Sequence, residues 1–464
     1  MIFRSRPKFL TLQAIEVRIF LTILVVVSFH FNPRMGQTER YLGLTRAIVD
    51  HHHWDVSEHV AESGSDILYR NGKSYVTIPP GISLLLVPVY LLEKALLRIF
   101  TGLSMHLRGL YASLSIWLLM APLMAIAGVL YFRALKKLGA DRSKRLWLVL
   151  TLCLGSLFFY YGVTGVWTHS YSTAILTIAL SLLILEVNPV FIGVTLGAEL
   201  LIDYAGIVPI AALAGCSLLQ SAKKGTHDFF RTALFLGIPL TAAFAILSYY
   251  HYSISGNIFV SPNTLFAEQL RAQSFFPNNE AIFGFPSAAS VWGLTFSPYR
   301  GLFLYFPPAL LSFYAFRSPF CRRNPIAWLG IISAVGILTF NACYYSWSGS
   351  SCFGPRHLTM ALPFLLLPLV FVETKIIRGF CLTSFLFTFS GIATVYSDDV
   401  RINLATFLYR GLFLHWMWVI QYEILPAHFG IHLAYTSSVL PYAILSLVLW
   451  GIWRNKAGRR RGLI

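Results

Sequence analysis

Long runs of apolar residues, separated by short polar segments, make up most of the chain. A membrane-spanning helix needs about 20 predominantly apolar residues, and a charge in mid-bilayer is costly. The run at 190–220 carries Glu199 and Asp203 near its middle, so we divide it into two short helices near Asp203. Twelve spans are then predicted, from residues 15–31, 108–132, 146–161, 171–187, 190–220, 232–252, 300–316, 325–345, 357–373, 379–396 and 436–453.

The composition supports this interpretation. Hydrophobic residues make up 56% of the 464 residues and charged residues only 12%, against about 25% charged in an ordinary soluble domain. So few charges could not cover the surface of a soluble fold, and so apolar a chain is not intrinsically disordered. The predicted fold class is an all-α polytopic membrane protein.

The chain is basic, with 36 Lys and Arg against 19 Asp and Glu. Cytoplasmic loops of membrane proteins collect Lys and Arg, and no zinc-finger spacing or phosphate-binding glycine loop accompanies the charge. We therefore expect no nucleic-acid partner. The clusters predicted to be cytoplasmic are residues 1–8, 133–145, 223–231, 317–323, 375–378 and 454–461.

All these clusters fall on one side of the membrane if residues 80–100 lie at the outer interface instead of crossing. Prolines at the start of this segment also disfavour a regular span. Both termini are then cytoplasmic. The prediction is one integral-membrane domain, 1–464, with a first extracytoplasmic loop at 32–107 that carries interfacial amphipathic helices and a second at 253–299.

Carboxylates are frequent in the first predicted loop. Glu39 lies a few residues beyond the first helix, where it could reach a lipid-anchored substrate, while Asp50 and Asp55 follow further along. Three consecutive histidines, 51–53, do not converge on one face of a regular element, so we expect no metal site there.

Polar residues also precede several predicted helices. Lys73 and Tyr75 follow an Asn-Gly turn and precede Pro79-Pro80-Gly81, although interfacial anchoring would also explain them. Arg300 and Arg356 each stand at the start of a predicted helix, where a cation and a helix N-terminus together suit an anion. Two such positions favour a phosphate over a neutral solute.

Several segments, in order, resemble the GT-C superfamily of integral-membrane glycosyltransferases, in particular its bacterial branch similar to dolichyl-phosphate-mannose-protein mannosyltransferases and the ArnT aminoarabinose transferase. The resemblance covers most of residues 15–370. It is carried by Glu39-Arg40-Tyr41, NGKSYVTIPPGISLLLVPVY at 71–90, VWTHSYS at 166–172, ELLIDYAG at 199–206, SPYRGLFLYFPPALL at 297–311 and SGSSCFGPRHLTMALPFL at 348–365.

The resemblance implies an inverting transferase that moves a sugar from a polyprenyl-phosphate donor to an acceptor hydroxyl on a lipid, glycan or protein, at the extracytoplasmic face of the plasma (inner) membrane. Glu39 matches the acidic residue of the family's first loop and is the expected general base, with Asp50 or Asp55 as substitutes. The expected phosphate ligands are Arg356, Arg300, Arg40 and Lys73, and the expected pocket residues are Tyr41, Tyr75, His169, Asp203, Tyr204 and His357.

Some relatives use a divalent cation, and no residue pattern in this chain identifies a cofactor. Two other functions stay open. An O-antigen ligase or polymerase would usually concentrate its function in a late loop, whereas the richest loop here is the first. A lipid or solute transporter would tend to show internal repeats, and none is evident. The sequence also leaves open whether Cys343 and Cys352 form a disulfide.

Overall fold

The computed structural model describes residues 12–32, 38–64, 66–99, 108–272, 282–350, 352–394, 399–432 and 438–454. These residues are mainly helical, and their sheet is a single two-stranded hairpin. The elements of the first half are α1 (Ala14–Phe29), α2 (Thr38–Arg46), η2 (Ala47–His51), η3 (Ser57–Glu62), β1 (Ile67–Arg70), β2 (Lys73–Val76), α3 (Gly81–Leu85), α4 (Val87–Ile99), α5 (Arg108–Ser115), η5 (Ile116–Met120), α6 (Ala121–Lys137), α7 (Arg142–Leu154), α8 (Leu157–Val163), α9 (Thr168–Ile184), α10 (Pro189–Ile202), η6 (Tyr204–Gly206) and α11 (Ile207–Ala222).

The second half is helical as well. Its elements are α12 (Thr226–Ser255), α13 (Pro262–Ala272), α14 (Ala288–Thr295), α15 (Leu302–Tyr305), α16 (Pro308–Tyr314), η7 (Ala315–Arg317), α17 (Pro319–Arg323), α18 (Pro325–Ala342), η8 (Arg356–Ala361), α19 (Leu362–Leu365), η9 (Pro368–Phe371), α20 (Thr374–Ile392), α21 (Val400–Arg410), α22 (His415–Val419), η10 (Ile420–Ile424), α23 (Leu425–Phe429) and α24 (Val439–Trp453).

Five helical stretches of the described residues are long and apolar enough to cross a membrane, or six if α7 and α8, bent by 44°, count as one span. The chain is therefore an all-helical membrane protein. Twelve spans stay a prediction, because α9, α10 and α24 are apolar but shorter. The five stretches are Tyr111–Lys137, Tyr204–Ala222, Thr226–Ser255, Pro325–Ala342 and Thr374–Ile392.

The predicted break in the 190–220 run is confirmed. Helix α10 ends at Ile202, and α11 begins at Ile207 after the short η6 turn. Asp203 stabilises the break, because its Oδ1 accepts a hydrogen bond from the backbone N–H of Ala205 at 2.9 Å. An exposed N–H at the start of a helical turn needs such an acceptor.

Two of the predicted spans are broken into short pieces. The 300–316 run forms α15 and α16, which are interrupted at Phe306, and the 357–373 run forms η8, α19 and η9. Proline explains both breaks, since Pro307, Pro363 and Pro368 lack the N–H that a continuous helix needs. Hydrophobicity alone gave no sign of these interruptions.

Helix α9 lies at the centre of the bundle, where it packs on α6, α10, α11 and η8. Every residue from His169 to Ile184 is buried. Two of its threonine hydroxyls are satisfied inside the helix, since Thr173 and Thr177 each donate to the carbonyl four residues earlier at 2.6 Å. Such small polar residues allow close approach of neighbouring helices without leaving an unpaired group.

Helices α10 and α12 approach closely through two glycines of α10. A side chain at Gly193 would come within 2.9 Å of the carbonyl oxygens of Phe235 and Leu236, and one at Gly197 within 3.1 Å of the Pro239 carbonyl. This is the small-residue spacing that lets membrane helices pack backbone to backbone. The two helices are thereby fixed along most of their shared length.

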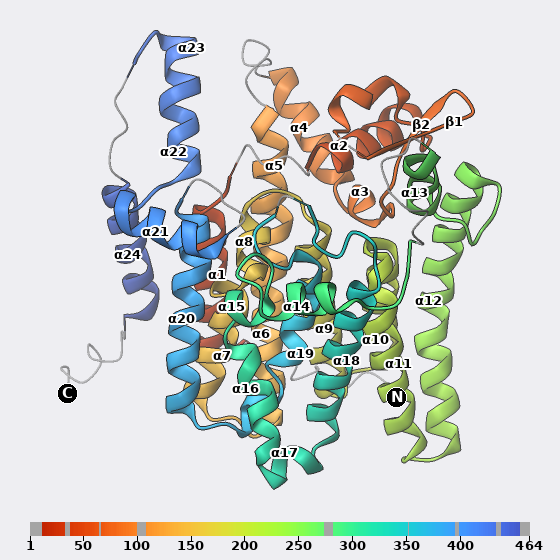
Figure 1. Ribbon diagram of the computed structural model, residues 1–464, viewed down its shortest axis with the longest axis vertical. Coiled ribbons are helices and arrows are strands. Elements are labelled where there is room, and N and C mark those ends of the chain that lie inside the picture. Colours follow the sequence, from red (N-terminus) through yellow and green to blue (C-terminus); the bar gives the residue numbers. More distant parts are fainter. Residues whose placement is uncertain are drawn as a thin grey trace, which may run out of the picture.

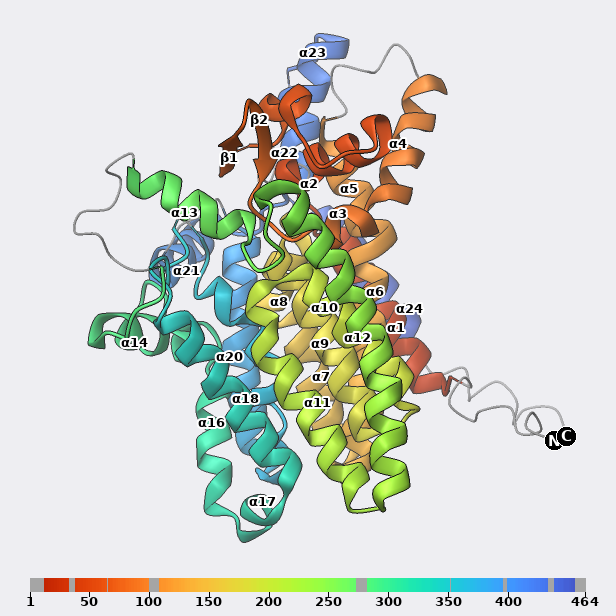
Figure 2. The ribbon, with the colours of Figure 1, turned by 90° about the vertical axis from the view of Figure 1, so that its right-hand side faces the viewer.

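A small cap covers one end of the bundle, which we call the hairpin end (Figures 1 and 2). It holds α2, α3, α4, β1 and β2. The predicted Asn-Gly turn is confirmed, because Arg70 pairs with Lys73 across Asn71 and Gly72, both at positive φ. Tyr250 of α12 anchors the hairpin by donating to the carbonyls of Val76 and Ile78.

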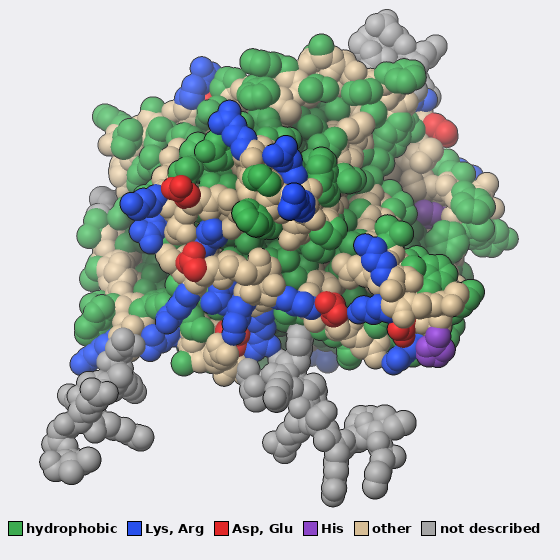
Figure 3. Space-filling view, turned by 90° about the horizontal axis from the view of Figure 1, so that it is seen from below, with side chains coloured by type: hydrophobic (Ala, Val, Ile, Leu, Met, Phe, Trp, Pro, Cys, Tyr) green, Lys and Arg blue, Asp and Glu red, His purple; other side chains and the backbone are tan. Residues whose placement is uncertain are grey.

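The opposite end carries many of the basic residues, and we call it the basic end. It includes α17 and the turns before α7 and α12. Figure 3 shows this face from below, with more Lys and Arg than Asp and Glu side chains. Glu186 there binds Lys137 at 2.7 Å and Lys224 at 3.1 Å, which joins the ends of α6, α9 and α11.

Candidate functional site

Four elements from distant parts of the chain meet at the hairpin end. The first turn of α9 contacts the end of α10, the start of η8 and α2. The ring of His169 lies 5.0 Å from that of His357, and His169 Nδ1 lies 3.8 Å from Asp203 Oδ2. Tyr41 of α2 hydrogen-bonds to Thr168, the first residue of α9. We call His169, Asp203, Arg356 and His357 the His169 cluster.

The cluster contains three buried side-chain nitrogens that have no hydrogen-bond partner among the described residues. They are Arg356 Nε, His357 Nε2 and His169 Nδ1. The Arg356 guanidinium also lies over the ring of Trp167, with its Cζ 5.6 Å from the ring centroid. Buried polar groups are nearly always paired, so the three nitrogens indicate a place for a polar ligand; an anion would suit Arg356 Nε, which can only donate, and each ring nitrogen in the tautomer that donates.

The backbone before η8 leaves room for these side chains. Gly349 has a φ of +72°, and a side chain there would come within 3.0 Å of Arg356 Nε and 3.2 Å of His357 Nε2. Glycine adopts that conformation without strain and adds no side chain that would crowd Arg356 and His357. The Gly349 position therefore helps to keep Arg356 and His357 available.

Arg300 holds the backbone around Gly349 in place. It is fully buried, and its guanidinium donates to the carbonyls of Ser348 (2.8 Å), Tyr299 (2.9 Å) and Ser350. Backbone carbonyls thus occupy the donors that we expected to bind phosphate. We reassign Arg300 to positioning the loop that leads to Arg356.

Asp203 supplies a carboxylate beside the basic groups. One oxygen caps η6, as described above, and the other faces His169. The Asp203 side chain is only 14% exposed. A buried carboxylate next to an imidazole can orient that ring or accept a proton from a bound hydroxyl group.

The predicted start of the first loop lies beside the cluster. Glu39 is exposed in the first turn of α2, and its carboxylate packs near Gly64. Arg40 binds Asp66 at 2.6 Å. Burial raises the pKa of Tyr41, while the Arg40 cation lowers it and the Asp203 carboxylate raises it, so both charges act on this phenol. Tyr41 therefore joins α2 to the start of α9, and Glu39 and Arg40 precede it in the first turn of the same helix.

Asp50 and Asp55 lie elsewhere in the cap and are occupied by structural contacts. Asp50 accepts hydrogen bonds from Tyr90 at 2.5 Å and Lys94 at 2.7 Å, which ties α4 to η2. Asp55 accepts from the Ser57 hydroxyl and from the backbone N–H of Ser74. The structure does not bring either carboxylate to the His169 cluster.

We expect Asp50→Asn to lower the free energy of unfolding by about 1 kcal/mol, because it weakens two hydrogen bonds to a charged group. Burial raises the pKa of Asp50, but the Lys94 and Tyr90 hydrogen bonds outweigh it and hold the pKa below its ordinary value of 3.8. The charge therefore stabilises the fold fully above that value, and its contribution is lost as pH falls through the lower folded value.

Thermal unfolding in detergent at neutral pH and below pH 4 measures this effect. The matched control is Glu58→Gln, which removes a carboxylate of the same cap that is 68% exposed. Equal midpoints for Asp50→Asn and the wild type at neutral pH would contradict the prediction.

Three other candidates have no contact with the unpaired nitrogens. Lys73 is exposed beside the hairpin turn, and Tyr75 is buried against Leu247 and Tyr250 of α12. Tyr204 hydrogen-bonds to Nε2 of His251 at 3.0 Å. Tyr75 attaches the hairpin to α12 and Tyr204 attaches η6 to it, and the structure gives none of the three residues a contact with the unpaired nitrogens.

Sequence reasoning missed two neighbours of the site. Asp66 of the first loop is the partner of Arg40. Tyr344 lies with its ring 6.3 Å from that of His357. Neither has a local signal in the sequence, because each contact joins segments that lie apart along the chain.

The described residues offer little support for a metal site or a disulfide. Within the described ranges, no group of three or more His, Cys, Asp or Glu side chains is placed to hold a metal ion. All six cysteines are described, and all are free, so Cys343 and Cys352 are not paired in this structure.

Comparison with known proteins gives little further guidance. No protein-family model and no curated protein matches the chain. Among solved structures, it is similar to archaeal oligosaccharyltransferase AglB from Archaeoglobus fulgidus in complex with an inhibitory peptide and a dolichol-phosphate. The identity is 13%, the TM-score is 0.39, and the match covers 94% of this chain and 54% of that one, so the chain spans about half its length. So low a similarity carries no argument about this chain.

Proposed function

We propose that this protein is a GT-C-type glycosyltransferase that moves a sugar from a polyprenyl-phosphate donor to an acceptor hydroxyl at the extracytoplasmic membrane face. The observation that carries the proposal is the His169 cluster, in which unpaired basic nitrogens lie buried beside a carboxylate. A donor phosphate would supply the acceptors that these nitrogens lack.

The two ends of the bundle support the proposed sidedness. The cluster lies at the first turn of α9, and the Lys137–Glu186–Lys224 contacts lie just beyond its last turn. A helix of 17 residues is about 25 Å long, close to the thickness of the hydrocarbon core. Because Lys and Arg concentrate on the cytoplasmic side, the cluster would lie on the opposite side.

Arg356 would bind the donor phosphate, with His357 and His169 as further hydrogen-bond donors. The acceptor oxygen attacks the anomeric carbon as the bond from that carbon to the phosphate oxygen breaks, and the bonding electrons go to the phosphate. The fixed Arg356 cation stabilises the negative charge that develops there.

Glu39 is our preferred general base, because it is exposed in the first turn of α2, the helix that Tyr41 joins to the start of α9, and a carboxylate there can take the proton of an incoming hydroxyl. Asp203 would then position His169. Arg40, held by Asp66, would keep the first turn of α2 in place. Asp50 and Asp55 have no part in this scheme, since their oxygens are engaged elsewhere.

The proposal predicts transfer of label from a radiolabelled polyprenyl-phosphate sugar to acceptors in a membrane extract by the purified protein in lipid vesicles. The same donors should remain intact with vesicles that lack the protein. Labelled lipid that crosses the bilayer without any transfer of sugar would contradict the proposal and favour a transporter.

A further inference from the structure

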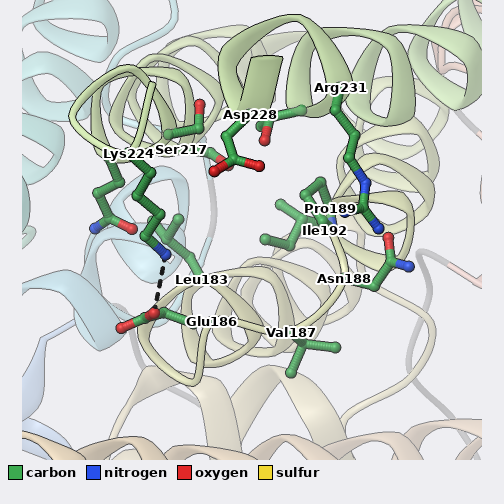
Figure 4. A pocket seen from close by; sticks show the side chains of 13 residues that line it. Leu183, Glu186, Val187, Asn188, Pro189, Ile192, Ser217, Lys224, Asp228 and Arg231 are labelled. Carbon is green, nitrogen blue, oxygen red and sulfur yellow. Dashed lines mark hydrogen bonds and ion pairs between the residues drawn. The ribbon is translucent and has the colours of Figure 1, made fainter. Parts of the chain in front are cut away.

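A polar cavity lies at the basic end, among the ends of α9, α10, α11 and α12. Its volume is about 240 Å³ (Figure 4). Its lining includes residues from the last turn of α9 to the first turns of α12, so the length of α9 separates it from the His169 cluster. The proposed transfer reaction gives this cavity no role.

The cavity is lined by charges of both signs. Lys224 and Arg231 contribute two cations, and Glu186 and Asp228 contribute two carboxylates. In Figure 4, Lys224 and Glu186 lie together on one side, Arg231 lies on the other, and Asp228 extends from α12 between them. The lining is thus polar and balanced in charge.

Two of these charges are available to a ligand. Lys224 and Glu186 bind each other at 3.1 Å. Within the described residues, Arg231 makes no hydrogen bond or ion pair, and its contact is with the ring of Phe235 at 5.5 Å. Asp228 faces His227 at 3.9 Å, and that histidine is 90% exposed. Arg231 and Asp228 therefore offer one positive and one negative group on the same helix.

Exposed apolar side chains occur on α10 and α12 outside the cavity lining. Phe230 and Leu234 of α12 are 67% and 58% exposed, and Phe191 at the start of α10 is 56% exposed. Only 22% of the most apolar window of α12 is buried in the protein. A polar cavity at one end of helices with lipid-facing apolar side chains suits an amphipathic ligand. Its polar head group would lie in the cavity and its apolar chains in the bilayer.

We propose that this cavity binds the head group of a phospholipid that carries a phosphate and a primary ammonium, as phosphatidylethanolamine does. Arg231 binds the phosphate, Asp228 accepts hydrogen bonds from the ammonium, and the acyl chains extend from the cavity into the bilayer beside α10 and α12. The lipid would fix the ends of α10 and α12 on the cytoplasmic side.

Charge and hydrogen bonding select this head group. An anionic lipid without an amine would satisfy Arg231 and leave Asp228 beside a negative group. A choline head group carries a positive charge but no N–H, so it could not donate to Asp228. A head group with a phosphate and a primary ammonium can bind both Arg231 and Asp228.

Native mass spectrometry of the full chain, released from membranes with equal amounts of ethanolamine, choline and glycerol phospholipids, tests the proposal. We expect one retained ethanolamine lipid, preferred over the other two by about tenfold. Equal retention of all three lipids would overturn the proposal. Soluble phosphoethanolamine, which lacks acyl chains, should not displace the lipid, and displacement at equal concentration would also overturn it.

Two variants locate the site. Asp228→Asn should lose the preference for ethanolamine over choline lipid, whereas Arg231→Gln should weaken retention of both. Arg322→Gln, an exposed basic residue of the same end outside the cavity, should retain the wild-type selectivity. Selectivity unchanged in both cavity variants would place the lipid elsewhere. Neither result depends on glycosyl transfer, so the transferase proposal can fail independently.

Discussion

Arg356→Ala is expected to reduce sugar transfer by about 10²–10³-fold, the usual loss when a fixed donor to a developing negative charge is removed. The expectation rests on position, because Arg356 is the one arginine that joins the unpaired nitrogens of the His169 cluster. The initial rate of label transfer at saturating donor measures the loss. Arg356→Lys keeps the charge but not the planar fork, so it should recover part of the rate.

The matched control is Arg322→Ala, which removes an exposed arginine at the basic end. It should transfer sugar at the wild-type rate. Wild-type transfer by Arg356→Ala, with the variant folded as judged by its unfolding midpoint, would remove the phosphate role from the cluster.

Glu39→Gln should lower the rate of transfer by about 10²–10⁴-fold, because an amide cannot accept the proton of the acceptor hydroxyl. The affinity for the donor should change little, since Glu39 is not one of the groups that we propose to bind the phosphate. Rates at varied donor concentration separate these two effects.

Glu58→Gln is the control for this experiment, because Glu58 is an exposed carboxylate of the same cap. It should leave transfer unchanged. If Glu39→Gln retained full activity while Asp203→Asn lost it, Asp203 would be the base, and the phosphate-binding role of Arg356 would still stand.

The sequence predicted features that depend on neighbouring residues. The break at Asp203 follows from a carboxylate inside an apolar run, and the hairpin turn follows from Asn71-Gly72. The position of the neighbouring residues Arg356 and His357 at the start of a helix could likewise be predicted without tertiary information. Such features could be found because the physical cause lies within a few residues.

Other features depend on contacts between distant segments. Asp50 becomes structural through Lys94, 44 positions away, and Tyr41 reaches Thr168 across 127 positions. The complete burial of Arg300 under three carbonyls could not be distinguished from a phosphate site, because both place an arginine before a helix. Periodicity and charge carry no information on such pairings.

Binding of a polyprenyl phosphate to the purified protein in nanodiscs tests the central claim most directly. Photo-crosslinking from a reactive group next to the phosphate would locate the contact. The account predicts crosslinks to peptides that contain His169 or Arg356, and their loss in Arg356→Ala but not in Arg322→Ala. Crosslinks confined to the basic end, or equal in all three proteins, would contradict it.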